Sequence, residues 1–344
     1  MEITPTQPKP RVRRGSGRIT LADVARVAGV APMTASRALN APDTVNAEMV
    51  ERVRRAVLDT GYVPNLLAGA LASARSLLVA VIVPSIASTL YLEFLQALRS
   101  ALASKNYQVI LGESDYAHQD EPALLNALIA RRPEAIVNVG TIRSPEGRLQ
   151  LTAAQIPVIE TWDMTSEPID MLVGFSQVGV GRAAADFLIT EGRRHPAIIS
   201  ASDERAAMRA EGFLSEINER TATDAPAVYI PAPSTLGAGR RAFVKLLAEN
   251  PLTDSVFCSS DIIALGVLIE AKSRGLHIPA DIAVIGFGDH NFAADTDPPL
   301  TTIRADGKII GREAARLILE RAAQIPCLEP IVDVGFSIVR RQSA

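Results

Sequence analysis

Aromatic side chains and cysteines are scarce in this chain. Only 4% of its 344 residues are aromatic, with a single tryptophan, whereas 48% are hydrophobic. The core must therefore consist mostly of aliphatic side chains, and a largely disordered chain is excluded. Two cysteines, Cys258 and Cys327, exclude a disulfide framework. The four histidines are widely separated, so no metal-ligand spacing is present and neither a metal nor a cofactor is expected.

Long apolar segments are also missing. No apolar run reaches the roughly 18 residues of a membrane helix. The first residues lack the apolar stretch of a secretory signal. These absences predict a soluble cytoplasmic protein without a membrane partner.

The net charge of −3 is close to balance, which argues at first against nucleic acid. The charge is unevenly distributed, however. Residues 1–75 contain 11 Lys and Arg against six Asp and Glu, a surplus of five positive charges, and the remainder has a surplus of eight negative charges. Such asymmetry indicates a basic head on an acidic body. Chance clustering is the alternative reading.

The basic head divides into three parts. Residues 1–18 are basic and proline-containing and predict a disordered tail, which either attracts phosphates or only aids solubility. Residues 19–64 predict three short helices, the first opened by a capping box from Thr20 to Asp23 and ended by Gly29, and the third capped by Asn46. Two helices joined by a glycine turn describe a helix-turn-helix unit, although a helical subdomain without DNA would have the same spacing.

Residues 65–75 form either a linker or a conditional helix. The stretch from Asn65 to Ser73 is compatible with a helix but short, and isolated helices of this length are marginal in water. A partner that packs against the stretch would be needed to fold it.

From Leu77 onward, short apolar strands alternate with amphipathic helices. This alternation predicts parallel sheets covered on both faces. About 270 residues are more than a domain with a single sheet usually contains. Residues 76–344 therefore predict an α/β body of two Rossmann-like lobes with a ligand cleft between them.

Several blocks resemble the lac/galactose repressor family. In the head they are TLADVARVAGV at 20–30, MTASRALN at 33–40 and GYVPN at 61–65. In the body they are GRRH at 192–195, FCSSDIIALG at 257–266, GLHIPADIAVIGF at 275–287 and PLTTI at 299–303. Within the family the chain is most similar to gluconate-operon repressors, through MT at 33–34, IPVIE at 156–160 with Asp163, VGF at 173–175, DER at 203–205, VFC at 256–258 and VGFS at 334–337. The resemblance implies a helix-turn-helix head on a body of the periplasmic-binding-protein type.

The resemblance also implies which residues meet DNA. In a helix-turn-helix unit the second helix enters the major groove, where Arg37 can pair with guanine and Met33 can contact a thymine methyl. Leu71 matches the hinge residue that opens the minor groove in relatives. The full expected DNA-binding set is Thr20, Pro32, Met33, Thr34, Ser36, Arg37, Asn40, Asn46, Tyr62, Asn65, Ala68 and Leu71. Ala31 departs from the family, which usually has Ser or Thr there, so fewer backbone contacts are expected at this position.

The effector should lie between the lobes, at the carboxyl ends of the strands. Arg205 and Arg209 are four residues apart at the start of a helix and can face one anion, although surface salt bridges would also explain them. The expected effector-binding set is Ser85, Tyr91, Glu160, Asp163, Arg205, Arg209, Asp261, Asp289 and His290. His290 could equally be a loop residue held by hydrogen bonds.

Two departures from relatives that bind ring-shaped effectors point to an open-chain sugar acid. Ser234 stands where several relatives have a stacking aromatic residue, and Gly288 stands where many have a ligand-binding Asp. Together with two arginines, they favour gluconate, a ketogluconate or a phosphogluconate as effector. A neutral sugar is the alternative.

An enzyme is a competing reading. Gly179, Gly181 and Ala184 fit a dinucleotide-binding pattern, with Asp203 about 20 residues later. The resemblance places an ordinary helix start there instead. A nucleophile elbow at Ser176 is excluded by its spacing.

A sugar-binding protein without DNA is the second alternative, and it would not carry a helix-turn-helix head. We therefore expect a cytoplasmic, nucleoid-associated repressor that binds palindromic double-stranded operator DNA as a homodimer and is released by a sugar acid. No heptad helix follows the last strand, so the tetramerisation tail of the lac repressor is not expected.

Overall fold

The computed structural model describes residues 19–63, 75–116 and 120–344. The chain divides into two compact units, with the boundary between Ser76 and Leu77. The expected disordered tail at 1–18 and most of the expected hinge at 65–75 lie outside the described residues, and so do Asn65, Ala68 and Leu71.

The head unit is all helical. It contains α1 (Leu21–Ala28), α2 (Pro32–Asn40), the short 3-10 helix η1 (Pro42–Thr44) and α3 (Ala47–Thr60). Apolar side chains at helical spacing, such as Val24, Ala28 and Val53, form its buried core. Asp23 accepts hydrogen bonds from the backbone N–H and the hydroxyl of Thr20, at 3.0 and 2.7 Å, so the acid of the predicted capping box reaches back as expected.

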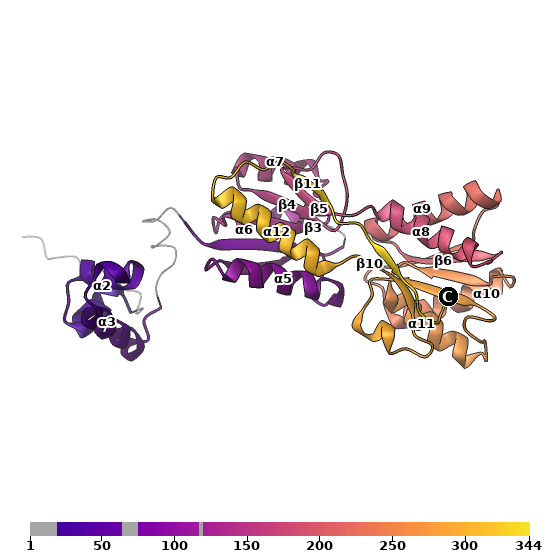
Figure 1. Ribbon diagram of the computed structural model, residues 1–344, viewed down its shortest axis with the longest axis horizontal. Helices are drawn as coiled ribbons and strands as arrows, with labels where there is room; N and C mark the ends of the chain where they lie inside the picture. Colours follow the sequence, from indigo (N-terminus) through magenta and orange to yellow (C-terminus); the bar gives the residue numbers. More distant parts are fainter. Residues whose placement is uncertain (1–18, 64–74, 117–119) are drawn as a thin grey trace, which may run out of the picture. The chain divides into compact units, whose positions relative to one another are not determined.

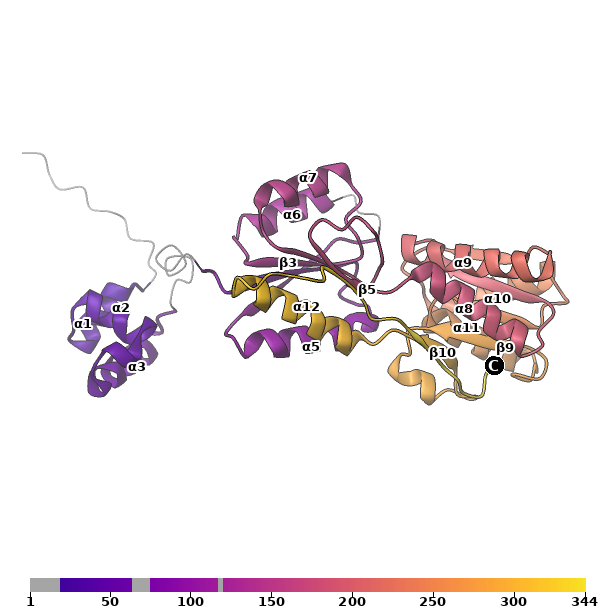
Figure 2. The same cartoon turned by 45° about the horizontal axis from the view of Figure 1, so that its top comes forward.

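The first lobe of the body is a sheet of six strands within the described residues, in the order β11-β5-β4-β3-β1-β2 (Figure 1). The strands are β1 (Leu78–Val83), β2 (Gln108–Glu113), β3 (Ala135–Val139), β4 (Val158–Thr161), β5 (Met171–Gly174) and β11 (Ile331–Asp333). Helices α5 (Leu92–Ala103) and α12 (Gly307–Ala322) cover one face, and α6 (Glu121–Ile129) and α7 (Pro145–Ala154) cover the other (Figure 2). Alternate residues explain the two layers, since Val79 and Val81 join one core whereas Ala80 and Ile82 join another.

The second lobe repeats this plan with the order β12-β10-β9-β8-β6-β7. Its strands are β6 (Pro196–Ala201), β7 (Ala227–Ile230), β8 (Ser255–Cys258), β9 (Ala283–Phe287), β10 (Thr301–Arg304) and β12 (Ser337–Val339). Helices α8 (Gln177–Thr190) and α9 (Glu204–Thr221) lie on one face, and α10 (Leu236–Glu249) and α11 (Asp261–Ser273) on the other (Figures 1 and 2). The two short 3-10 helices of the body are η2 (Thr89–Tyr91) and η3 (Asn291–Ala294).

Three chain crossings connect the lobes, from β5 to α8, from β10 to α12 and from β11 to β12. The expected pair of Rossmann-like lobes is confirmed, and β12, antiparallel to β10, is the exception to parallel pairing. Because both sheets are otherwise parallel, the carboxyl ends of their strands gather functional loops in the gap between the lobes.

Candidate DNA-binding and effector sites

The head presents the second helix of its helix-turn-helix unit to solvent. Met33 is 67% exposed, and Arg37 makes no hydrogen bond or ion pair to any described residue. Pro32 and Asn40 are also exposed, whereas Thr34 and Ser36 are half-buried. These side chains on one exposed helix can reach base edges and phosphates.

Other residues of the head cap its helices or pack them together. Asn46 caps α3 by accepting the N–H of Glu48 at 2.9 Å, and Tyr62 is half-buried against the head core. Arg52 of α3 donates to the carbonyl of Ala28 at 2.6 Å, which fixes α3 against the turn after α1. Ala31 stands at the N-cap of α2 and has no side chain to cap it.

A cavity of about 420 Å³ lies between the two lobes of the body. Five of the predicted effector residues line it, namely Ser85, Tyr91, Arg205, Arg209 and His290. Ser85 and Tyr91 come from the first lobe, and the other three come from the second. The volume falls within the range of small-molecule sites.

Arg209 is the buried cation of this cavity. Its guanidinium donates to Gln177 Oε1 and, at 3.0 Å, to the carbonyl of Ser259, and it stacks over Phe287 at 4.2 Å. No described carboxylate forms an ion pair with it, and its Nε is buried without a hydrogen-bond partner. Burial lowers the pKa of Arg209 to about 10, so the side chain remains charged near neutral pH.

Arg205 connects the lobes across the same cavity. It donates to the hydroxyl of Tyr91 at 2.8 Å, and its guanidinium lies 5.8 Å from the centre of that ring. Tyr116 lines the wall nearby, and burial raises its pKa to about 12, which keeps the phenol protonated. The cavity therefore offers two guanidinium groups and neutral hydroxyls.

Trp162 and Gln177 were not selected from the sequence, yet they complete the cavity wall. Gln177, the first residue of α8, donates to the carbonyl of Trp162 at 2.7 Å. Trp162 lies directly after β4, has a left-handed φ of 63° and contacts Tyr91 edge-on at 5.3 Å between centroids. Its position at the carboxyl end of a predicted strand is the sequence feature that could have identified Trp162 as a cavity residue.

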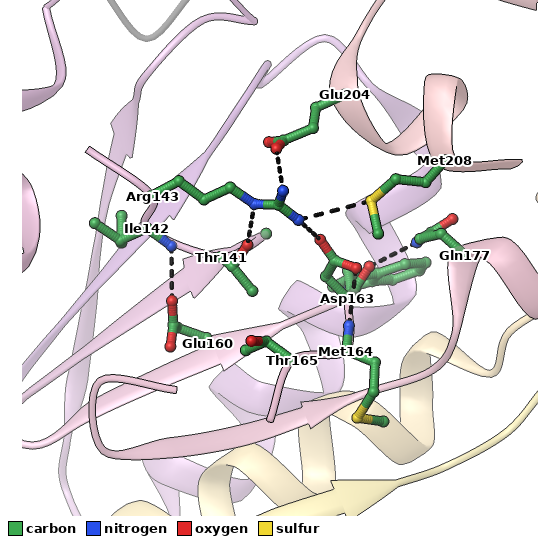
Figure 3. A network of polar contacts seen from close by, with 12 residues as sticks. Thr141, Ile142, Arg143, Glu160, Asp163, Met164, Thr165, Gln177, Glu204 and Met208 are labelled. Atoms are coloured by element: carbon green, nitrogen blue, oxygen red, sulfur yellow. Dashed lines mark hydrogen bonds and ion pairs between the residues drawn. The ribbon is translucent and has the colours of Figure 1, made fainter. Parts of the chain in front are cut away.

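Four predicted effector residues do not line this cavity. Glu160 is fully buried in β4 and accepts the N–H of Ile142 at 2.7 Å (Figure 3) and the N–H of Ile169 at 2.8 Å, so it fixes two loops instead. Burial also raises its pKa. Asp261 is fully buried as well and accepts from Thr302 Oγ1 at 2.6 Å and the N–H of His290 at 2.8 Å.

The two remaining carboxylates lie in neighbouring hollows. Asp163 lines a space of about 20 Å³ beside Arg205, and burial raises its pKa. Asp289 pairs with Arg341 at 2.6 Å and lines a separate cavity of about 360 Å³ near the crossing from β10 to α12. His290 and Trp162 line both that cavity and the interlobe cavity.

The cavity wall contains more aromatic side chains than the sequence predicted. Ser234 does line the cavity as expected, and its hydroxyl lies 3.2 Å from that of Ser260. Four aromatic side chains from elsewhere nevertheless line the same space: Tyr91, Tyr116, Trp162 and Phe287. The replacement at Ser234 therefore does not leave the cavity without rings.

The dinucleotide pattern has a packing explanation. Gly179 and Gly181 lie inside α8, and a Cβ on Gly181 would lie 1.9 Å from the carbonyl oxygen of Arg209 in α9. Gly181 therefore allows two helices to approach closely. The capping serine, Ser176, accepts the N–H of Gly179 at 2.9 Å.

No helix in the described part of the chain is long and apolar enough to cross a membrane. Over the same residues, no group of three or more His, Cys, Asp or Glu side chains is arranged to hold a metal ion.

Comparisons with known proteins agree with this arrangement. Residues 20–65 match the bacterial regulatory proteins of the lacI family, and residues 185–344 match a periplasmic binding protein-like domain. The chain is 39% identical to the transcriptional regulator GntR of Pseudomonas aeruginosa, over 96% of this chain and 97% of that protein. It is 30% identical to the regulator IdnR of Escherichia coli, over 93% and 97% of the two chains.

Solved structures show the same architecture. A LacI-family regulator from Silicibacter pomeroyi superposes with a TM-score of 0.89 at 32% identity, covering 94% of this chain and 99% of that one. The lac repressor dimer bound to operator superposes with a TM-score of 0.80 at 23% identity, covering 95% and 99%. The chain therefore belongs to the lacI family of bacterial regulatory proteins, and it is a DNA-binding transcriptional regulator rather than an enzyme.

Proposed function

We propose that this regulator is a homodimeric repressor of sugar-acid catabolism genes, released from a palindromic operator by gluconate or a related sugar acid. Such a repressor acts in the cytoplasm, where the operator is. Two-fold symmetry of a dimer matches a palindrome.

The observation that carries the choice of effector is a set of buried donors without acceptors. Among the described residues, two buried side-chain N–H donors of the interlobe cavity lack a hydrogen-bond partner, Trp162 Nε1 and Arg209 Nε, whereas the ring nitrogen Nδ1 of His290 lies 3.4 Å from Asp261 Oδ2. Buried donors without acceptors are costly, so their concentration around one cavity favours an acceptor-rich ligand.

A carboxylate is the ligand group that best satisfies these buried donors. It contributes two acceptor oxygens and the negative charge that Arg209 lacks among the described residues. The hydroxyls of a sugar-acid chain can accept from Arg205 and exchange hydrogen bonds with Tyr116 and Asp203, which also line the cavity. Two relatives that share the name GntR, from Pseudomonas aeruginosa and Escherichia coli, are compatible with this class.

A neutral sugar remains the second candidate, because the four aromatic residues of the wall could stack on a ring. Calorimetric titration with gluconate, glucitol and glucose separates the two. Glucitol has the same carbon chain as gluconate but no carboxylate. Tight binding of gluconate alone supports the proposal, and preference for glucose supports the neutral-sugar reading.

For the head, we propose that Pro32, Met33 and Arg37 face bases. Contacts to the DNA backbone and support of the recognition helix would come from Thr20, Thr34, Ser36, Asn40, Asn46 and Tyr62. A hinge that folds on DNA would contain Asn65, Ala68 and Leu71. Leu71→Ala tests the hinge. It should weaken operator binding and leave gluconate affinity unchanged, and unchanged operator affinity would contradict the assignment.

A further inference from the structure

Arg143 joins the two lobes from outside the effector cavity. It lies on the first-lobe loop between β3 and α7, and its Nη1 pairs with Glu204 Oε1 of the second lobe at 2.7 Å (Figure 3). Its Nη2 lies 3.7 Å from Met208 Sδ, also in the second lobe. Arg143 does not line the interlobe cavity.

The first lobe holds this guanidinium in place. Arg143 Nε donates to Thr141 Oγ1 at 3.1 Å, and Nη2 lies 3.6 Å from Asp163 Oδ2 (Figure 3). The Asp163 side chain is only 2% exposed. These two first-lobe contacts hold the Arg143 side chain where it also reaches Glu204 of the second lobe.

The partner in the second lobe is the start of α9, which also carries the arginines of the cavity. Glu204 and Met208 face Arg143, whereas Arg205 and Arg209, each one residue further on, line the cavity. Residues four apart lie on the same side of a helix. One side of this segment therefore contacts Arg143, and the neighbouring side lines the effector cavity. Movement of α9 away from the first lobe would break the ion pair and displace both arginines together.

We propose that Arg143 is a positioning residue, an interlobe clasp that favours the closed arrangement of the lobes and thereby tightens effector binding without touching the effector. This inference rests on the proposed effector site. When only the closed fraction binds, the apparent dissociation constant equals the intrinsic constant divided by that fraction. Arg143 and Glu204 are 51% and 45% exposed, so the expected effect is modest, about two- to fivefold.

Four variants test the clasp: Arg143→Gln, Glu204→Gln, the double variant, and Arg182→Gln as a matched control. Arg182 has comparable exposure, and its ion pairs with Glu216 and Glu219 stay within the second lobe. Each single clasp variant should raise the dissociation constant for gluconate two- to fivefold. The double variant should be no weaker than the weaker single variant, because both substitutions remove one interaction.

A second measurement uses no effector. Trp162 is the only tryptophan, is 2% exposed and lies in the cavity wall. If the clasp keeps the lobes closed, acrylamide should quench Trp162 fluorescence more strongly in the clasp variants than in Arg182→Gln, and 0.5 M NaCl should reduce the difference.

Equal quenching in the clasp variants and the control would overturn the proposal, as would fully additive losses of affinity in the double variant. Failure of the unaltered protein to bind gluconate would contradict the proposed effector instead. The quenching comparison would then still decide whether Arg143 holds the lobes together.

Discussion

The guanidinium of Arg209 lies over the ring of Phe287, with 4.2 Å between Cζ and the ring centroid. Phe287 ends β9 and Arg209 lies in α9, so the sheet and a helix of the second lobe jointly hold one cation against the cavity. With no ion-pair partner among the described residues and a buried Nε, this cation is prepared for an anion.

Removing the cation should remove most of the effector affinity. Arg209→Met keeps an unbranched apolar side chain but removes the guanidinium over Phe287 and its charge, so gluconate affinity should fall about 10- to 100-fold. Calorimetry measures the loss, and circular dichroism checks the fold. Arg182→Met, in which an exposed arginine of α8 is removed, should bind gluconate normally. Equal affinity in Arg209→Met would show that the effector does not use this group.

Effector affinity should depend on pH on the alkaline side. The pKa of Arg209 is lowered to about 10 by burial. The charged form that attracts a carboxylate is therefore complete near neutral pH and is lost as the pH rises through this value. Gluconate affinity should be constant around pH 7 to 8 and decline toward pH 10, as followed by titration calorimetry. A decline below pH 7 would point to a different group.

The close approach of α8 and α9 should be sensitive to one methyl group. A Cβ at Gly181 would lie 1.9 Å from the Arg209 carbonyl oxygen, and the added group must separate the helices. Gly181→Ala should destabilise the body by about 1 to 3 kcal/mol and weaken gluconate binding, because Arg209 moves with α9.

Gly237→Ala is the control for that substitution. Gly237 lies in α10, and its Cβ would meet only Arg241 Nη1, at 3.4 Å. Thermal unfolding should show a neutral or stabilising effect there, since alanine favours helices. A neutral Gly181→Ala would contradict the packing explanation of the glycine pattern.

The head should gain stability from a single hydroxyl. Ala31 is the N-cap of α2 and offers no acceptor to the first N–H groups of the helix. Ala31→Ser should stabilise this helix by about 1 kcal/mol and strengthen DNA binding through added phosphate contact. Hydrogen exchange of the amides of α2 and duplex titration measure the two effects. Ala31→Val, which provides no acceptor, should show neither.

Much of the body could be predicted because buried parallel strands are short apolar runs. Strands β3, β4, β5 and β8 are fully buried runs of four or five mostly apolar residues, the pattern from which the α/β body was predicted. Helices α7 and α12 and strands β10, β11 and β12 were not predicted as elements. The last two contain three residues each, too few for a recognisable period. Nor does the chain order reveal that α12 returns to the first lobe.

The effector site was predictable only in part, for a reason that Glu160 and Asp261 illustrate. Both carboxylates lie at or near the carboxyl ends of strands, where ligands bind, but backbone N–H groups and a threonine hydroxyl occupy them. The sequence indicates where a strand ends and a loop begins, but it does not indicate which hydrogen-bond donors surround a carboxylate at that place. Likewise, the ion pair between Arg143 and Glu204 depends on the placement of two lobes, which no local pattern encodes.

The most direct test of the account measures operator release. A duplex selected by the full-length protein from random sequence is labelled, and its fluorescence anisotropy is followed as gluconate or glucitol is added. We predict that gluconate lowers the anisotropy to that of free duplex at concentrations matching its calorimetric affinity, whereas glucitol has no effect. A duplex that remains bound at saturating gluconate, or that is released equally by glucitol, would contradict the account.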